Sequence, residues 1–160
     1  MNRVNYKSGP QISKYRQFLF FSLRETARLS YGYRISRKSL AHLKTSIIRS
    51  SKDPNFITEI AIEADSIVGT YWIHRRADHV FLLHFFIPHQ LRRRGFGSEI
   101  WSRMIVRAEE YGMPVLKFAV SARNTKALGF YARNGAHITD TEMRGGMQWF
   151  EMEAQLQKSI

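Results

Sequence analysis

The residues best suited to chemistry occupy positions 92–98, which read Arg-Arg-Arg-Gly-Phe-Gly-Ser. They follow an apolar run at 80–87 and lead into a segment whose apolar residues have helical spacing. A helix that begins on glycines presents unpaired N–H groups and a partial positive charge, and glycine lets a ligand come close to the backbone. With three arginines beside these donors, the segment predicts a binding site for a phosphate or pyrophosphate group. Two alternatives stay open, because glycine is common at strand-to-helix turns and the arginines also fit a solvated run.

The spacing of the glycines excludes two common nucleotide sites. A P-loop requires GxxxxGK followed by Ser or Thr, and the sequence has no such stretch. The dinucleotide fingerprint GxGxxG fails as well, because Gly97 is followed by Ser98, Glu99 and Ile100. The expected ligand is therefore neither a nucleoside triphosphate in a P-loop nor NAD.

The apolar pattern predicts the elements that position this site. Alternating or continuous apolar runs predict strands, and apolar residues three and four apart predict helices. In chain order we expect a strand at 4–7, helices at 12–29 and 37–50, strands at 57–63, 67–74 and 80–87, a helix at 95–111, a strand at 115–120, a helix at 124–134, and a hairpin of strands at 136–141 and 147–154. This order predicts a single α/β domain over residues 1–160, with helices on both faces of a mixed sheet.

Positive charge is concentrated at the beginning of the chain. Of the formal net charge of +12, residues 1–52 account for +11, with 12 Lys and Arg against the single acidic residue Glu25. Residues 53–160 contain 13 basic and 12 acidic residues, a net charge of +1. The first segment is either a solvated basic face or a surface that attracts an anionic partner such as RNA, DNA or an acidic protein.

Several classes of protein are excluded or disfavoured by composition. The absence of cysteine excludes disulfides, thiolate metal sites and a cysteine nucleophile. The N-terminus has neither the apolar core of a secretory signal nor a run long enough to span a membrane, so we expect a cytoplasmic protein without a membrane partner. His79, His84 and His89 repeat every five residues and share no face of a strand, so no metal site is expected.

Two motifs resemble those of the GNAT N-acetyltransferases. Residues 92–97 resemble the family's Q/R-x-x-G-x-G/A motif. Residues 124–136 are similar to its N-x-x-A-x-x-F-Y-x-x-x-G-F segment, with Ala136 in place of the final Phe. The element order also agrees from about residue 55 to the C-terminus. The resemblance implies a mainly antiparallel sheet of six to seven strands with about four helices, and strands that splay at the acyl-CoA site.

The resemblance also implies acetyl-CoA as cofactor and direct attack of a primary amine on its thioester. Tyr131 occupies the place of the general acid that protonates the departing thiolate. Backbone amides at 93–98 bind the pyrophosphate, and main-chain groups of the strand ending at Ile87 bind the pantetheine arm. The implied cofactor-binding residues are Phe85, Ile87, Arg92, Arg93, Arg94, Gly95, Phe96, Gly97, Ser98 and Asn124.

Three roles stay open at this point. Tyr131 is also compatible with a core aromatic residue, and Asn124 with the cap of the helix that follows it. The general base is not identified. Candidates are His74, His84, Glu59 and Glu63, and a water-mediated or substrate-assisted route is an equal alternative.

The acceptor is described only by class. In this family the segment between the first two helices helps to form the acceptor side, and here that segment, 30–34, lies within the basic part of the chain. The first hypothesis is an amine of a small molecule, peptide or protein. The alternatives are an anionic or RNA-linked acceptor such as aminoacyl-tRNA, and a non-enzymatic RNA- or DNA-binding module on the same fold. The resemblance further suggests a homodimer formed through the C-terminal hairpin.

Overall fold

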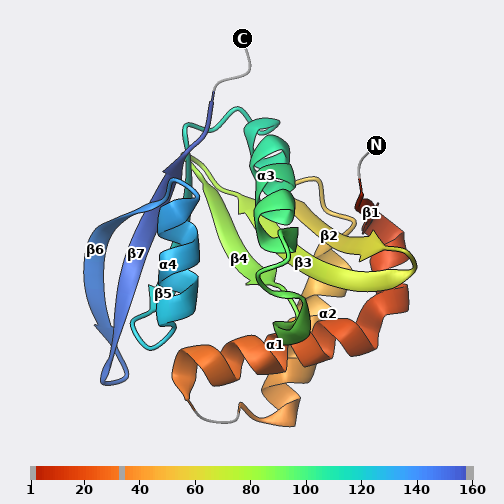
Figure 1. Ribbon diagram of the computed structural model, residues 1–160, viewed down its shortest axis with the longest axis horizontal. Coiled ribbons are helices and arrows are strands. Elements are labelled where there is room, and N and C mark those ends of the chain that lie inside the picture. Colours follow the sequence, from red (N-terminus) through yellow and green to blue (C-terminus); the bar gives the residue numbers. More distant parts are fainter. Residues whose placement is uncertain (1–2, 33–34, 158–160) are drawn as a thin grey trace.

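A computed structural model describes residues 3–32 and 35–157, which form one sheet with helices on both faces (Figure 1). The strands are β1 (Asn5–Ser8), β2 (Phe56–Glu63), β3 (Ser66–Arg75), β4 (Val80–Phe86), β5 (Val115–Ser121), β6 (His137–Arg144) and β7 (Met147–Gln155). The helices are α1 (Arg16–Tyr31), α2 (Arg37–Ser50), α3 (Phe96–Glu109) and α4 (Thr125–Arg133), with short 3-10 turns η1 (Gly9–Tyr15) and η2 (His89–Leu91). The predicted fold class and order of elements are confirmed.

The sheet is mixed and mainly antiparallel. Its seven strands within the described ranges have the order β1-β2-β3-β4-β5-β7-β6, and only the pair β4–β5 is parallel. β4 lies at the centre, which accounts for its nearly continuous apolar sequence because both of its faces are covered. The predicted sheet of six to seven strands is therefore confirmed.

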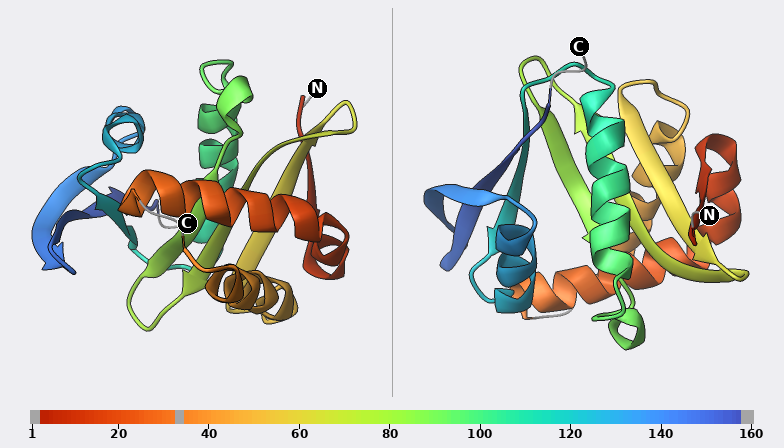
Figure 2. Two further views of the ribbon diagram at one scale, coloured as in Figure 1. Left: turned by 90° about the horizontal axis from the view of Figure 1, so that it is seen from below. Right: turned by 45° about the horizontal axis from the view of Figure 1, so that its top comes forward.

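Helix α3 lies on one face of the sheet and helices α1 and α2 lie on the other (Figure 2). A separate apolar core fills the space on each face. On one face α3 buries a stripe of side chains spaced four residues apart, namely Phe96, Ile100, Met104 and Ala108. On the other face α1 and α2 bury Leu19, Leu23, Leu40 and Ile47. Burial of one large aliphatic side chain contributes roughly 1.5–3 kcal/mol, so packing of these stripes holds the helices on the sheet. No helix among the described residues is long and apolar enough to cross a membrane.

The predicted start of the first helix is wrong. Instead of one helix over 12–29, the chain forms the 3-10 turn η1 and then α1. Pro10 lies at the start of η1, where its missing N–H removes no helical hydrogen bond. α1 ends at Gly32, whose φ of 71° is the left-handed conformation and whose N–H donates to the Arg28 carbonyl over 3.0 Å.

The last hairpin is longer than predicted. β6 continues to Arg144, so the turn consists of Gly145 and Gly146, with φ of 55° and 78°. Two consecutive left-handed residues suit a tight hairpin turn. β6 is also exposed along its whole length, contrary to the expected alternation, because it is the outermost strand and no helix covers it.

Candidate active site

The central opening of the sheet lies between β4 and β5. The two strands pair only where Val80 meets Leu116 and Phe81 meets Lys117. Beyond Phe81 the edge of β4 that faces β5 has no strand partner in the described part of the chain. The splay that the resemblance implied is therefore present, and it leaves main-chain N–H and C=O groups of β4 available to a ligand that lies along the strand.

A bulge in β4 sets the direction of the side chains in this opening. Trp72 pairs with His84 but Ile73 pairs with Leu82, so Leu83 is the extra residue. After the bulge, His84 points toward α1, where it meets Ser22. Side chains at 85 and 87 point to the opposite face and pack in the core beneath α3. His84 therefore points to the opposite face from Phe85 and Ile87, as expected, and the bulge lies just before it.

The N-terminus of α3 has free donors, as predicted for residues 92–98. The first helical hydrogen bond runs from the Glu99 N–H to the Gly95 carbonyl, over 3.1 Å. Within residues 3–32 and 35–157 no acceptor is found for the amides of Phe96, Gly97 and Ser98. Three amides and the positive end of the helix dipole therefore face the same space as the arginine loop. These residues fit the pyrophosphate of a CoA-type cofactor.

The two glycines of this motif are required for different physical reasons. Gly95 has a φ of 89°, and a Cβ there would meet no atom within 4 Å, so its backbone conformation demands glycine. A Cβ on Gly97 would lie 3.0 Å from the ring of Phe130 in α4. Gly97 therefore also lets α4 pack against α3. The sequence predicted only that this glycine lets a ligand come close to the backbone. Arg93, with a φ of 61°, is the non-glycine left-handed residue of the loop.

Arg92 anchors the loop to the end of β4. Its Nε donates to the Ile87 carbonyl over 3.0 Å, and its guanidinium lies 6.0 Å from the ring centroid of Phe86. The Ile87 carbonyl, which was expected to serve the pantetheine arm, is therefore already in a hydrogen bond. Arg93 and Arg94 are exposed and face solvent.

Tyr131 connects the two separating strands. Its side chain is 8% exposed, and its ring centroid lies 4.6 Å from that of Phe118 in β5 and 6.3 Å from that of Phe85 in β4. Burial raises the pKa of the Tyr131 phenol, so the group stays protonated at neutral pH. No hydrogen bond to its hydroxyl is found among the described residues. The ring is therefore part of the core, as the alternative for this residue predicted, and the buried phenol stays protonated close to residues of both strands.

Asn124 is the N-cap of α4, which was the alternative role predicted for this residue. Its side-chain oxygen accepts a hydrogen bond from the Ala127 N–H over 3.3 Å. The side-chain NH₂ group has no partner within the described ranges. Since only the oxygen is used by the cap, the NH₂ group remains available to a ligand.

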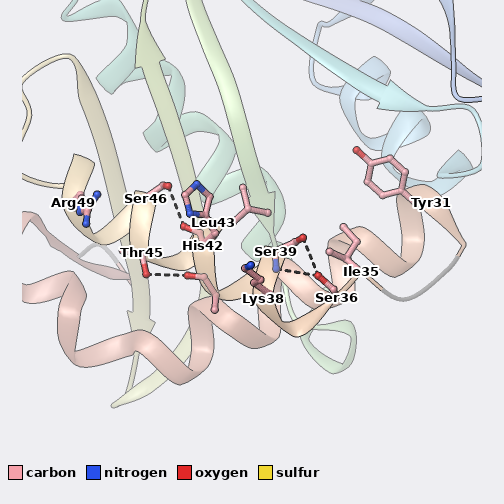
Figure 3. A pocket seen from close by; sticks show the side chains of 11 residues that line it. Tyr31, Ile35, Ser36, Lys38, Ser39, His42, Leu43, Thr45, Ser46 and Arg49 are labelled. Carbon is pink, nitrogen blue, oxygen red and sulfur yellow. Dashed lines mark hydrogen bonds between the residues drawn. The ribbon is translucent and has the colours of Figure 1, made fainter.

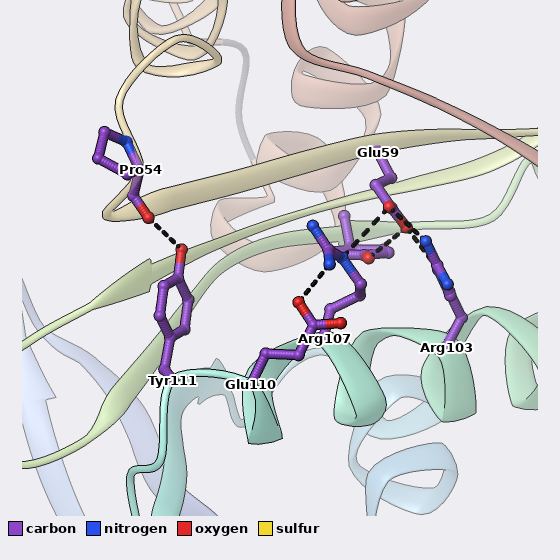
Figure 4. Close-up of polar contacts among 7 residues, drawn as sticks. Pro54, Glu59, Arg103, Arg107, Glu110 and Tyr111 are labelled. Atoms are coloured by element: carbon purple, nitrogen blue, oxygen red, sulfur yellow. Dashed lines mark hydrogen bonds and ion pairs between the residues drawn. The ribbon is translucent and has the colours of Figure 1, made fainter.

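Both carboxylates among the four candidate general bases are engaged elsewhere. Glu59 is 2% exposed and accepts from Tyr71 Oη over 2.5 Å and from Arg103 over 2.9 and 3.0 Å, with Arg107 at 3.5 Å (Figure 4). Glu63 pairs with Arg3 near the start of the chain. These carboxylates hold elements together on the sheet and do not face the opening between β4 and β5.

The histidine candidates differ from each other. His74 stacks on Phe56, with ring centroids 4.0 Å apart, and lies beside the closed end of the β4–β5 pair. His84 is 5% exposed, and its Nε2 lies 3.0 Å from Ser22 Oγ. Because Ser22 Oγ already donates to the Leu19 carbonyl over 2.9 Å, His84 Nε2 is the donor and Nδ1 is unprotonated. Burial lowers the pKa of His84 to about 4, so its ring is neutral at pH 7.

A set of residues that the sequence did not indicate surrounds the end of α1. The rings of Tyr31 and Trp149 have centroids 5.2 Å apart. A Cβ on Gly32 would lie 2.3 Å from the guanidinium of Arg123, so this glycine lets the arginine pack against the helix end. In sequence, only the glycine after a helical pattern hints at this arrangement, because the partners are more than 90 residues away.

The fold and the site together define a class of protein. Strands that separate beside the free amides of a helix, with a protonated phenol between them, suit an acyltransferase that binds its acyl-CoA between the strands. The sequence agrees, since residues 20–136 match the model of the acetyltransferase (GNAT) family. The chain therefore belongs to the GNAT family of acetyltransferases, whose cofactor is acetyl-CoA.

Solved structures of GNAT enzymes share this fold at low sequence identity. PaiA N-acetyltransferase from Thermoplasma acidophilum, in complex with coenzyme A, is 18% identical with a TM-score of 0.75, over 97% of this chain and 99% of that chain. Ribosomal-protein-S18-alanine N-acetyltransferase from Escherichia coli is 13% identical with a TM-score of 0.70, over 98% and 96%. Spermidine N-acetyltransferase from Vibrio cholerae, in complex with CoA and spermine, is 12% identical with a TM-score of 0.77, over 96% and 95%. At these identities the likeness shows the fold alone. Among curated proteins, no sequence matches the chain significantly.

Proposed function

We propose that this acetyltransferase acts on a primary amine of a small molecule, peptide or protein, which attacks the thioester directly. The observation that supports this most strongly is the coincidence of three features: the free amides at the start of α3, the unpaired edge of β4, and the phenol of Tyr131 between β4 and β5. Acetyl-CoA supplies the activated acetyl group when it is bound.

In this proposal the α3 loop binds the pyrophosphate. The amides at 93–98 donate to the phosphate oxygens, and Arg93 and Arg94 add positive charge beside them. Arg92 acts mainly by fixing the loop on the Ile87 carbonyl. Main-chain groups of Phe85 and Ile87 that are not already paired, together with the Asn124 NH₂ group, hold the pantetheine arm against β4.

Tyr131 is proposed as the general acid. Its buried phenol holds a proton at Oη, and the raised pKa keeps that proton in place until a more basic atom comes within reach. A departing thiolate is such an atom. The acceptor ammonium must lose a proton before it attacks, and we assign that proton to the unprotonated Nδ1 of His84 as one route. Because His84 is buried and its pKa is low, a water molecule is the other route for this proton.

The cofactor proposal is tested by removing one amide. Ser98→Pro deletes an N–H that has no intrahelical acceptor, and proline is tolerated in the first turn of a helix. Ser98→Ala keeps that N–H and is the matched control. Because a hydrogen bond to a charged group contributes about 1.5–3 kcal/mol, calorimetry should show acetyl-CoA affinity reduced about tenfold or more in Ser98→Pro only.

Failure of this test has a clear meaning. If the folded wild-type protein does not bind acetyl-CoA at all, the proposed activity is wrong, and the non-enzymatic alternative would be favoured. If Ser98→Pro binds as tightly as wild type, the amide of residue 98 is not a ligand.

A further inference from the structure

A glycine in β3 lies where the two proposed cofactor-binding elements meet. Gly69 is buried, and a Cβ at this position would lie 2.6 Å from Ile100 Cδ1 in α3 and 2.7 Å from Ile87 Cδ1 just after β4. The same Cβ would lie 2.9 Å from the carbonyl oxygen of Phe86. Non-bonded carbon atoms pack at about 3.5–4.0 Å, so no larger residue fits here unless its neighbours move.

Backbone conformation does not account for this glycine. Gly69 is not among the glycines with positive φ, whereas Gly95 is. Glycine in the interior of a strand is unfavourable, and it often marks a place where another element comes close. Its partner on β2 is Ala61, which is 1% exposed and belongs to the core that α3 covers. Two small residues side by side therefore let α3 pack close to the sheet at this point.

Both isoleucines that surround Gly69 belong to the candidate cofactor site. Ile100 directly follows the free amides of 96–98 in α3. Ile87 follows the unpaired edge of β4, and its carbonyl accepts from Arg92 of the arginine loop over 3.0 Å. The missing side chain in β3 thus determines how closely the amides of α3 approach the edge of β4.

Other contacts prevent α3 from taking up a displacement as a whole. Glu59 of β2 accepts hydrogen bonds from Arg103 over 2.9 and 3.0 Å, which fixes the middle of α3 to the sheet (Figure 4). On another side of the first turn, a Cβ on Gly97 would lie 3.0 Å from the ring of Phe130. A group that pushes on Ile100 would therefore tilt the amide end of α3 relative to β4.

The open groove along α2 has no part in this arrangement (Figure 3). The groove has a volume of about 1060 Å³ and is lined by Tyr31, by residues of α2 and by the two residues just before α2. Among the described residues, none from β3, β4, α3 or α4 lines it. α2 and the core beneath it, which includes the fully buried Ile47, therefore offer control positions away from the cofactor elements.

We propose that Gly69 is a positioning residue of the cofactor site. The space that it leaves lets the first turn of α3 and the end of β4 adopt the separation that one acetyl-CoA molecule spans. This inference rests on the proposed function, in which the pyrophosphate lies on α3 and the pantetheine arm lies on β4. Gly69 acts through Ile100 and Ile87. Because both parts belong to one cofactor molecule, a changed separation prevents it from making both sets of contacts well.

The first test is Gly69→Ala, with acetyl-CoA affinity measured by calorimetry. The added methyl overpacks the contact and forces small backbone shifts, so the affinity should fall about tenfold or more. Ile47→Val is the control, because it lowers stability without touching either cofactor element. If Gly69→Ala does not fold in buffer, all proteins are compared in sucrose, which favours the folded state. Wild-type affinity in Gly69→Ala would overturn the proposal, and so would an equal loss in Ile47→Val.

The second test removes the methyl groups that the new Cβ would meet. Ile87→Val and Ile100→Val each delete a Cδ1 atom, and together they form a reference double variant. Adding Gly69→Ala to this double variant should lower acetyl-CoA affinity by less than about threefold, since the remaining close contact is the Phe86 carbonyl. A full tenfold loss in the triple variant would mean that the two isoleucines do not transmit the effect, and the proposal would be wrong.

Failure of this proposal is distinct from failure of the proposed function. If the folded wild-type protein does not bind acetyl-CoA, the proposed function is wrong and the role of Gly69 is wrong with it. If wild type binds acetyl-CoA and Gly69→Ala binds it equally well, the proposed function stands and only the positioning role is lost.

Discussion

The two faces of the sheet differ in the size of their apolar core and in the groups that they expose. The side formed by α3 and α4 buries a large core with a cluster of aromatic rings and exposes main-chain donors at one helix end. The side formed by α1 and α2 has a smaller core and exposes a basic face. Residues 1–52, which include both of these helices, have a net charge of +11, against +1 for the rest of the chain.

In the proposed function, this difference separates recognition of the cofactor from recognition of the acceptor. A cofactor bound through backbone amides needs a local strand–loop–helix geometry, which a short motif can specify. An acceptor recognised by side-chain charge can be changed by surface substitutions that leave the fold intact.

The largest effect is expected on the cofactor side, from Tyr131→Phe. The variant keeps the ring that packs on Phe118 and loses the proton that the proposed mechanism needs. General acid catalysis contributes typically 10²–10⁴-fold, so kcat should fall by about 100-fold or more while calorimetric CoA affinity is retained. Tyr111→Phe, at a tyrosine bonded to the Pro54 carbonyl, is the control and should keep normal turnover. Full activity of Tyr131→Phe across the pH range would rule out the acid role.

The next effect concerns the buried charge that joins α3 to the sheet. Glu59→Gln removes the negative charge that Arg103 and Arg107 share and leaves the Arg103 guanidinium without its anionic partner, whereas Arg107 keeps Glu110. Breaking a buried pair from one side is strongly destabilising, and we expect about 3 kcal/mol less free energy of unfolding by denaturant titration. Glu63→Gln removes an exposed pair with Arg3 and should cost about 1 kcal/mol or less. Similar losses in the two variants would mean that burial of Glu59 adds nothing to its pairing.

A smaller effect is expected from pH on the α1 side. Since burial lowers the pKa of His84 from 6.5 to about 4, the unfolded chain takes up a proton below pH 6.5 that the folded chain does not. Stability contributed by this neutral histidine is therefore complete above pH 6.5 and decreases toward pH 4, by about 2 kcal/mol between pH 7.5 and pH 5. Unfolding measured at both pH values should show this loss in wild type and in His89→Gln, but not in His84→Gln. An unchanged loss in His84→Gln would assign it to other groups.

The smallest effect concerns discrimination between acceptors. The basic face of α1 and α2 should repel a polycation, so spermidine should be acetylated with a kcat/KM about tenfold below that of a monoamine of similar pKa at low salt. Added salt should reduce this gap through screening. A steady-state assay at two ionic strengths checks it, and efficient acetylation of spermidine at low salt would contradict the difference between the two sides.

Much of the fold was predictable because its elements are locally specified. The apolar run at 80–87, the glycine motif at 95–97 and the breaks at Pro114 and Gly135 each define an element boundary to within a few residues. The extra turn before α1 and the extended β6 were missed. Both depend on neighbours: η1 packs Ile12 under β2, and β6 is held by pairing with β7 rather than by its own apolar pattern.

The candidate site was predictable only in its local parts. By itself the sequence determined the order of elements, the helix that begins on glycines, the place of Tyr131 on its helix and the basic character of residues 1–52, since each follows from neighbouring residues. Only the tertiary structure decided that Gly97 packs against Phe130, that Ser22 orients His84, that Glu59 is consumed by two arginines, and that Tyr31 meets Trp149. These contacts join residues 33 to 118 positions apart, and no local pattern specifies which distant side chain will fill a given space.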